Sequence, residues 1–167
     1  GYIFNFEGAV RYQWAKEYYP TEYERLKNYI KAGRWNISGS SWDSTDPNIP
    51  SPESFFRNLL YGQEFFKKEF GKKSNDIFLP DCFGFGYTLP TIAAHSGIIG
   101  FSTQKLQHRK LPFYGDHKLP FMFGLWEGID GARIMAVPHA QDYVSRFDGQ
   151  ELSNNGKLVD LAKKGLN

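Results

Sequence analysis

The chain has 167 residues, one cysteine and a formal net charge of +2 from 20 basic and 18 acidic side chains. This near-neutral balance argues against a nucleic-acid-binding protein, which would cluster Lys and Arg on one face, and a single cysteine excludes an intrachain disulfide. Because no apolar stretch reaches the roughly 20 residues that cross a bilayer, and residues 1–6 lack a signal-peptide pattern, we expect a soluble protein with no membrane partner, in a compartment that the sequence leaves open.

Strands and helices are predicted to alternate along most of the chain. Four short apolar runs predict strands, over residues 2–6, 34–38, 76–79 and 98–103. Helices are predicted between them, as two stretches divided by Pro20, a long amphipathic stretch from Ser51 to Gly71, and a short one over residues 90–95. The order strand, helix, strand indicates right-handed βαβ units and therefore an α/β fold with a parallel sheet.

Local signals predict where these helices begin and end. Thr21 is expected to cap the second helix, with Glu24 reaching back to its backbone. Ser51 followed by Pro52 is typical of a helix start, and Gly71 is typical of a helix end.

The pattern changes in the last third of the chain. The stretch "FMFGLWEGIDGARIMAVPH" predicts two strands joined by a tight turn at Asp130-Gly131, and so a β-hairpin toward the C-terminal part. The tail from Gly149 is polar and then weakly helical over residues 157–164. No repeat and no linker marks a second domain.

One carboxylate stands where a predicted buried strand ends. In "FLPDCFGFGYTLP", Asp81 comes directly after Pro80, while Gly84 and Gly86 permit a sharp turn. Because functional groups collect at the carboxyl ends of parallel strands, Asp81 is a candidate for chemistry. The alternative, that Asp81 only caps the following helix, fits the spacing equally well.

The polar loop at residues 39–50 offers a second carboxylate at another strand end. It contains Trp42, Asp43, Asp46 and Asn48, and one of its acids could reach the same cleft. Two carboxylates with aromatic walls suggest glycosidic chemistry, in which one carboxylate attacks and one acid protonates the leaving group. The alternative is that these acids only form turns.

Three separated stretches carry a family resemblance. The segment "FLPDCFGFGYTLPTIAAHSGIIGFSTQKL" contains Pro-Asp-x-Phe-Gly at a strand end and then Gly-x-x-x-Phe-x-Thr-x-Lys-Leu, while "WDSTDPNIPSPESFFRNLLYGQEFF" precedes it and "LWEGIDGARIM" follows it. In this order they resemble the motifs of glycoside hydrolase family 38, the class II α-mannosidases, over about residues 4–143.

The resemblance implies roles for individual residues. By position, Asp81 would be the nucleophile of a retaining α-mannosidase, which hydrolyses terminal α-linked mannose from glycans through a covalent mannosyl-aspartate. In the family the same aspartate also ligates a catalytic zinc, so the resemblance implies Zn²⁺ as cofactor and Asp81 as a metal ligand. Phe83 matches an aromatic that lines the sugar site, Lys105 matches a basic residue near the nucleophile, and Asp46 is a weaker substrate-binding candidate on the rim. The ordinary alternatives are core packing for Phe83, a surface salt bridge for Lys105 and an Asx turn for Asp46.

The sequence also departs from the family. Family members hold their zinc with a His-x-Asp pair at the end of the first strand, but no His-x-Asp occurs here, and the first histidine, His95, is expected to be structural. A further zinc histidine and the catalytic acid lie later in family members. Residues 1–167 are therefore predicted to be an internal part of the catalytic domain, a piece of a seven-stranded parallel (β/α) barrel, with residues 143–167 unassigned.

Such a piece has expected properties of its own. Alone it should bind zinc poorly and lack α-mannosidase activity, and its unpaired strand edges should favour self-association. Two other functions stay open. One is a non-catalytic carbohydrate-binding domain that uses the aromatic surface, and the other is a different metal-dependent carbohydrate hydrolase with a related α/β barrel.

Overall fold

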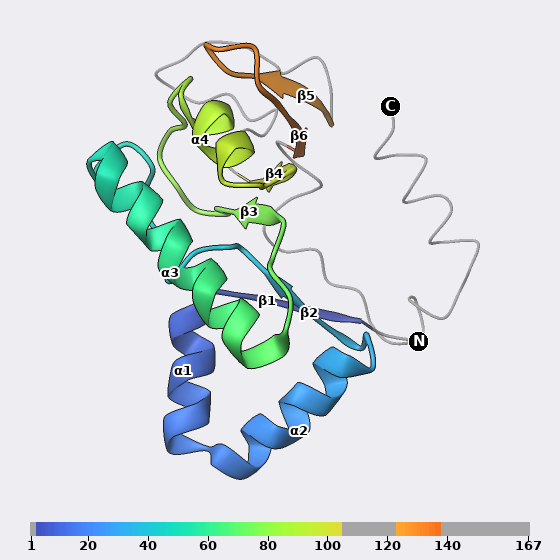
Figure 1. Cartoon of the computed structure of the whole chain (residues 1–167). Coiled ribbons are helices and arrows are strands. Elements are labelled where there is room, and N and C mark those ends of the chain that lie inside the picture. The colour runs from blue at the N-terminus through green and yellow to red at the C-terminus, as the bar shows by residue number, and fades with distance from the viewer. Residues whose placement is uncertain (1–2, 105–122, 138–167) are drawn as a thin grey trace, which may run out of the picture.

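The computed structural model describes residues 3–104 and 123–137, over which strands and helices alternate as predicted (Figure 1). In chain order the elements are β1 (Phe4–Glu7), α1 (Ala9–Tyr18), α2 (Pro20–Lys31), β2 (Trp35–Ser38), α3 (Pro52–Phe70), β3 (Asp76–Phe78), α4 (Leu89–His95), β4 (Gly100–Ser102), β5 (Gly124–Glu127) and β6 (Arg133–Val137). The predicted tail helix over residues 157–164 lies outside the described residues. None of the helices in the described ranges is both long and apolar enough to cross a membrane.

The strands form parallel pairs and one antiparallel hairpin. β1 pairs in parallel with β2, and β4 pairs in parallel with both β3 and β6. β5 pairs antiparallel with β6, and Asp130 and Gly131 lie in the turn between them, so the predicted hairpin is confirmed. The second strand of the hairpin is the one that lies beside β4, which leaves β5 at the outer edge of this sheet.

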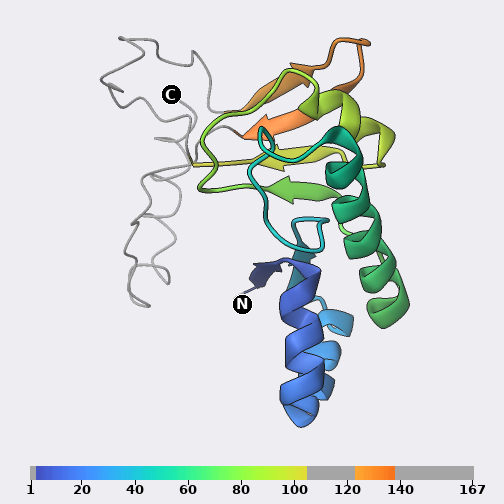
Figure 2. The same ribbon diagram turned by 90° about the vertical axis from the view of Figure 1, so that its left-hand side faces the viewer.

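The helices lie together on one side of the strands, as the view in Figure 2 shows. Successive side chains of a strand point to opposite faces, so each strand contributes alternate residues to the helix-covered face. Ile37, Ile77 and Phe101 are buried on that face, each between 2% and 3% exposed. The parallel α/β layering predicted from the sequence is therefore present.

The buried apolar residues divide into two clusters, one for each group of helices. The first joins α3 and α4 to β3, β4 and β6, and it consists of Phe55, Leu59, Ile77, Leu79, Cys82, Leu89, Ala93, Ile98, Phe101, Ile134 and Ala136. The second joins α1, α2 and α3 to β2, and it consists of Ala9, Tyr12, Tyr23, Ile30, Ile37 and Phe66. Because α3 contributes to both clusters, it ties the two halves of the described structure together.

A side chain replaces the main-chain ladder between β2 and β3. The strands form two separate sheets, β1-β2 and β3-β4-β6-β5. At the junction, the Asp76 carboxylate accepts hydrogen bonds from the Ser38 hydroxyl and, at 3.3 Å, from the Gly39 N–H. The Ser74 hydroxyl donates to the same carboxylate at 2.8 Å. The described residues do not close a barrel, so the predicted seven-stranded barrel stays a prediction.

The long helix begins and ends as its sequence predicts, whereas the cap predicted for α2 is wrong. The Ser51 hydroxyl accepts a hydrogen bond from the Ser54 N–H at 3.2 Å, and Gly71 ends α3 in the left-handed conformation, with φ +70°. In α2 the N-cap is Tyr19, without a side-chain cap. The fixed φ of Pro20 suits the first helical position, so the helix begins before Thr21 and leaves Thr21 inside the first turn.

Candidate active site

Asp81 lies on an exposed turn that follows the carboxyl end of β3. Its side chain is exposed, while its neighbours Leu79 and Cys82 are 3% and 8% exposed. The Leu79 N–H also donates to the Ser102 carbonyl of β4 at 3.0 Å, so the chain is held in register up to this point. The structure thus presents a carboxylate to solvent between two buried anchor residues.

The turn that carries Asp81 contacts the polar loop that follows β2. The Asp46 carboxylate accepts a hydrogen bond from the Phe83 N–H at 3.1 Å, and the Cys82 thiol donates to the Thr45 carbonyl at 3.3 Å. A Cβ atom added at Gly84, where φ is +150°, would lie 2.6 Å from the side-chain nitrogen of Asn48, so the Asn48 side chain would have to shift for any other residue at this position. The two segments predicted to share one rim do lie against each other.

Asp46 also forms the turn that was the ordinary alternative for it. Its second carboxylate oxygen accepts a hydrogen bond from the Asn48 N–H at 3.0 Å, as in an Asx turn. Both oxygens therefore already bond backbone N–H groups, and direct contact of Asp46 with a substrate stays a prediction.

The structure bears differently on the two other predicted substrate-binding residues, Phe83 and Lys105. The Phe83 side chain is 82% exposed, so core packing does not explain an aromatic at this position. It lies two residues from Asp81 on the same turn, where a sugar ring could stack on it, but that contact stays a prediction. Lys105 lies outside the described residues.

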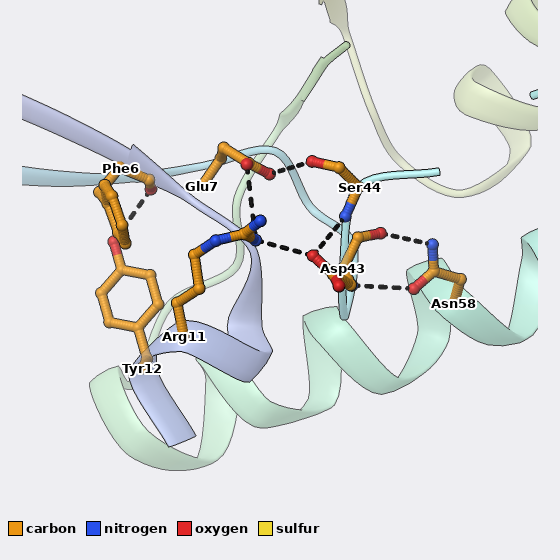
Figure 3. A network of polar contacts seen from close by, with 7 residues as sticks. All are labelled: Phe6, Glu7, Arg11, Tyr12, Asp43, Ser44 and Asn58. Atoms are coloured by element: carbon orange, nitrogen blue, oxygen red, sulfur yellow. Dashed lines mark hydrogen bonds and ion pairs between the residues drawn. The ribbon is translucent and has the colours of Figure 1, made fainter. Parts of the chain in front are cut away.

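A polar network that the sequence reasoning missed fixes the other end of the same loop (Figure 3). Arg11 of α1 donates to the Asp43 carboxylate at 2.7 Å and lies 3.5 Å from the Glu7 carboxylate. Glu7 in turn accepts a hydrogen bond from the Ser44 hydroxyl at 2.8 Å. The Asn58 side chain of α3 bonds both the N–H and the carbonyl of Asp43, at 3.0 and 2.8 Å. Only the spacing of Glu7 and Arg11, four residues apart, was readable in the sequence, whereas their joint contact with the loop depends on the fold.

The helix-free face of the strands contains an open cavity of about 620 Å³. Its lining comes from alternate positions of four strands, together with Phe6: Asn5, Phe6, Glu7, Asn36, Ser38, Asp76, Phe78 and Ser102. Neither Asp81 nor Phe83 lines it. Since Asp76 uses its carboxylate to join β2 to β3 and Glu7 bonds Ser44, the charged groups of this cavity serve structural contacts.

The described residues do not by themselves fit a zinc centre. Protein zinc sites use three or four side-chain ligands. Within residues 3–104 and 123–137, no three His, Cys, Asp or Glu side chains gather closely enough to hold a metal ion. Asp81 could supply one carboxylate only.

His95 has the structural role expected for it. Its Nε2 lies 2.7 Å from the Asp130 carboxylate, which also accepts a hydrogen bond from the Thr91 hydroxyl at 2.8 Å. These contacts tie α4 to the hairpin turn. The hydrogen bonds from Thr91 and His95 stabilise the charged form and lower the pKa of Asp130 to about 2.

Comparisons with known proteins agree on one family. The family profile described as "Glycosyl hydrolases family 38 N-terminal domain" matches residues 1–164. Alpha-mannosidase G of Dictyostelium discoideum is 43% identical over 162 residues, which cover 95% of this chain and 14% of that protein. Alpha-mannosidase 2C1 of Homo sapiens is 37% identical over 134 residues, which cover 80% of this chain and 12% of that protein.

A solved structure shows the same fold. The crystal structure of an alpha-mannosidase from Enterococcus faecalis V583 matches with a TM-score of 0.71 at 19% identity, over 98% of this chain and 18% of that chain. The chain therefore spans less than a fifth of the length of each of these three proteins.

Proposed function

This chain belongs to glycosyl hydrolase family 38, and from that premise we propose that the protein is a retaining α-mannosidase that removes terminal α-linked mannose from glycans. The observation that carries the proposal is the exposed Asp81 carboxylate, which lies on a turn at the carboxyl end of a parallel strand. The names of the two most similar relatives described above, both alpha-mannosidases, favour the same substrate.

In the proposed reaction Asp81 forms and then loses one covalent bond. Its carboxylate attacks the anomeric carbon of the mannoside, the glycosidic bond breaks, and the departing oxygen takes a proton from a general acid. Water then attacks the same carbon and gives a proton to the residue that had acted as the acid, the mannosyl–aspartate bond breaks, Asp81 leaves as a carboxylate, and the configuration is retained. The general acid would lie outside the described residues, roughly 5 to 5.5 Å from Asp81 in a retaining enzyme.

The remaining parts of the proposal concern the sugar contacts and the metal. Phe83 would offer an aromatic face to the sugar, Lys105 a bond to a hydroxyl or screening of carboxylate charge, and Asp46 a position on the rim. Zinc belongs to the proposal through the family alone. Asp81 would be one ligand and the others would come from outside the described residues, where the metal would orient sugar hydroxyls.

A non-catalytic carbohydrate-binding module is the second candidate. The observation that favours it is the exposure of two aromatic side chains on the Asp81 turn and just after it, with Phe83 82% and Tyr87 71% exposed. Aromatic faces can bind sugars without any chemistry. In that case Asp81 would not react with a glycosyl donor.

Covalent trapping separates the two candidates. The protein expressed from its natural gene is incubated with a fluorinated mannosyl donor, digested and mapped by mass spectrometry, with Asp81→Asn and Asp43→Asn as paired variants. We expect one mannosyl adduct on Asp81, absent in Asp81→Asn and present in Asp43→Asn. Sugar binding without an adduct on Asp81 would support the binding module instead.

A further inference from the structure

We propose that Asp46 is a positioning residue, whose carboxylate holds the turn that presents Asp81 by accepting the Phe83 N–H. The effect of Asp46 on catalysis rests on the function proposed above. The way in which Asp46 holds the Asp81 turn in place, called the hold below, does not depend on that function. This role differs from the sugar contact that the family position implies, because it acts through the backbone of Phe83.

The geometry gives Asp46 two tasks, one for each carboxylate oxygen. One oxygen accepts the Asn48 N–H at 3.0 Å and shapes its own loop. The other accepts the Phe83 N–H at 3.1 Å, across 37 residues of sequence. Hydrogen bonds from a backbone N–H to a carboxylate are among the stronger ones, since one partner is charged.

Two further contacts extend the interaction between this loop and the Asp81 turn to the residues on either side of Phe83. The carbonyl of Thr45, the residue before Asp46, accepts a hydrogen bond from the Cys82 thiol, and the Asn48 side chain lies so close to Gly84 that it would have to shift to admit a Cβ atom there. The loop therefore meets the backbone or side chain of each of the three residues after Asp81. On the other side, the Leu79 N–H is bonded to β4. Asp81 is thus exposed at the centre of a turn that is fixed from both ends.

Asparagine at position 46 separates the two tasks. Its single carbonyl oxygen can keep the Asx turn to Asn48, but its NH₂ group then faces the Phe83 N–H and cannot accept from it. Alanine removes both bonds. Glu64→Gln is the control, because Glu64 is exposed on α3 and belongs neither to this loop nor to the Asp81 turn.

The chain contains its own reporter of the hold. Cys82 is the only cysteine, it is 8% exposed, and it adjoins Asp81. We expect Asp46→Asn to raise the rate at which Cys82 reacts with a thiol reagent in the folded protein about tenfold. This corresponds to a decrease of about 1.4 kcal/mol in the free energy needed to open the Asp81 turn. Glu64→Gln should leave that rate within about twofold. An Asp46→Asn rate equal to wild type, with only Asp46→Ala faster, would show that the Asx turn alone matters and would overturn the proposal.

The second measurement is turnover of an aryl α-mannoside by the protein expressed from its natural gene. A displaced nucleophile should lower kcat of Asp46→Asn about tenfold to 100-fold, with KM changed much less, because the sugar contacts remain. If Cys82 responds but the wild-type protein lacks turnover and an Asp81 adduct, the mannosidase proposal fails while the hold stands. If the wild type turns over and Asp46→Asn keeps its kcat, the positioning role fails while the function stands.

Discussion

Ser40 stands in an unfavourable backbone conformation at the carboxyl end of β2. Its φ is +55°, and among the described residues it is the one non-glycine residue with a positive φ. The side chain is fully buried, and its hydroxyl has no hydrogen-bond partner in residues 3–104 and 123–137. The left-handed conformation costs a non-glycine residue roughly 1–2 kcal/mol, and an unsatisfied buried hydroxyl adds to that cost.

We therefore expect Ser40→Gly to stabilise the fold by about 1 kcal/mol, after allowance for the greater freedom of glycine in the unfolded chain. The free energy of unfolding from urea titration is the measurement. Ser41→Gly is the control, since Ser41 is buried without a positive φ and should lose about 0.5–1 kcal/mol. Equal losses from both variants would contradict this account of Ser40.

Close packing at Gly62 explains why the strained turn persists. A Cβ atom at Gly62 of α3 would lie 2.2 Å from the Ser41 carbonyl carbon, so the helix presses directly on the loop backbone. The carbonyls of Ser41 and Trp42 also accept the first N–H groups of α1, at 3.0 and 2.8 Å. The turn is thus fixed by two helices, and the same contacts set where the loop at residues 39–50 meets the Asp81 turn.

At the scale of whole elements, the junction between β2 and β3 depends on one carboxylate. Asp76 receives three hydrogen bonds there, from Ser38, Gly39 and Ser74, in place of a main-chain ladder. Removal of the carboxylate leaves these donors without their acceptor. We expect Asp76→Ala to lower the free energy of unfolding by about 3 kcal/mol, and Asp76→Asn, which keeps one acceptor oxygen, to lower it by less.

Urea titration of both variants checks this expectation, with Glu64→Ala on the exposed side of α3 as a neutral control. That control should stay within about 0.5 kcal/mol of wild type. An Asp76→Ala loss as small as that of the control would mean that side-chain packing alone joins the two sheets.

The contact between α4 and the hairpin should depend on acid pH. The pKa of Asp130 is lowered from 3.8 to about 2 by the hydrogen bonds from Thr91 and His95. A group with a lowered pKa stabilises the fold above its unfolded pKa, and this contribution is lost as the pH falls toward its folded pKa. We expect the Tm difference between wild type and Asp130→Asn to be constant between about pH 5 and pH 4, where His95 still carries its charge, and to shrink between pH 4 and 2. A difference that does not change over this window would argue against the contact in solution.

Local signals predicted the elements, and long-range contacts decided the rest. Ser51, Pro52 and Gly71 act within their own helix, so their roles were readable from the sequence. The prediction of Thr21 as a helix cap was wrong because Pro20 begins the helix earlier. Two neighbouring start signals competed, and the proline decided the first residue of the helix.

The placement of β6 beside β4, and the bond from Asp46 to the Phe83 N–H across 37 residues, could not be predicted in this way. Both depend on how distant segments meet. The position of Asp81 at a strand end was predictable because parallel strands gather their carboxyl ends, whereas the loop that holds its turn was not.

For the whole molecule, the strand at the outer edge of the larger sheet is the feature that bears on association in solution. β5 is paired on one side only within the described residues, and Leu125 at its centre is 63% exposed. Unpaired N–H and C=O groups beside an exposed apolar side chain offer a template for a second chain. Lys residues on an edge strand oppose such pairing.

We therefore expect the isolated 167-residue chain to self-associate, with a mean mass from light scattering that rises with concentration. Leu125→Lys should reduce this rise, because a charge on β5 cannot be buried between two edges. Leu60→Lys is the matched control. Leu60 is 53% exposed on α3, and its replacement removes a similar exposed apolar area that does not lie on a strand. Equal reductions from both variants would assign the association to general apolar surface, and a constant monomer mass in the wild type would contradict edge pairing altogether.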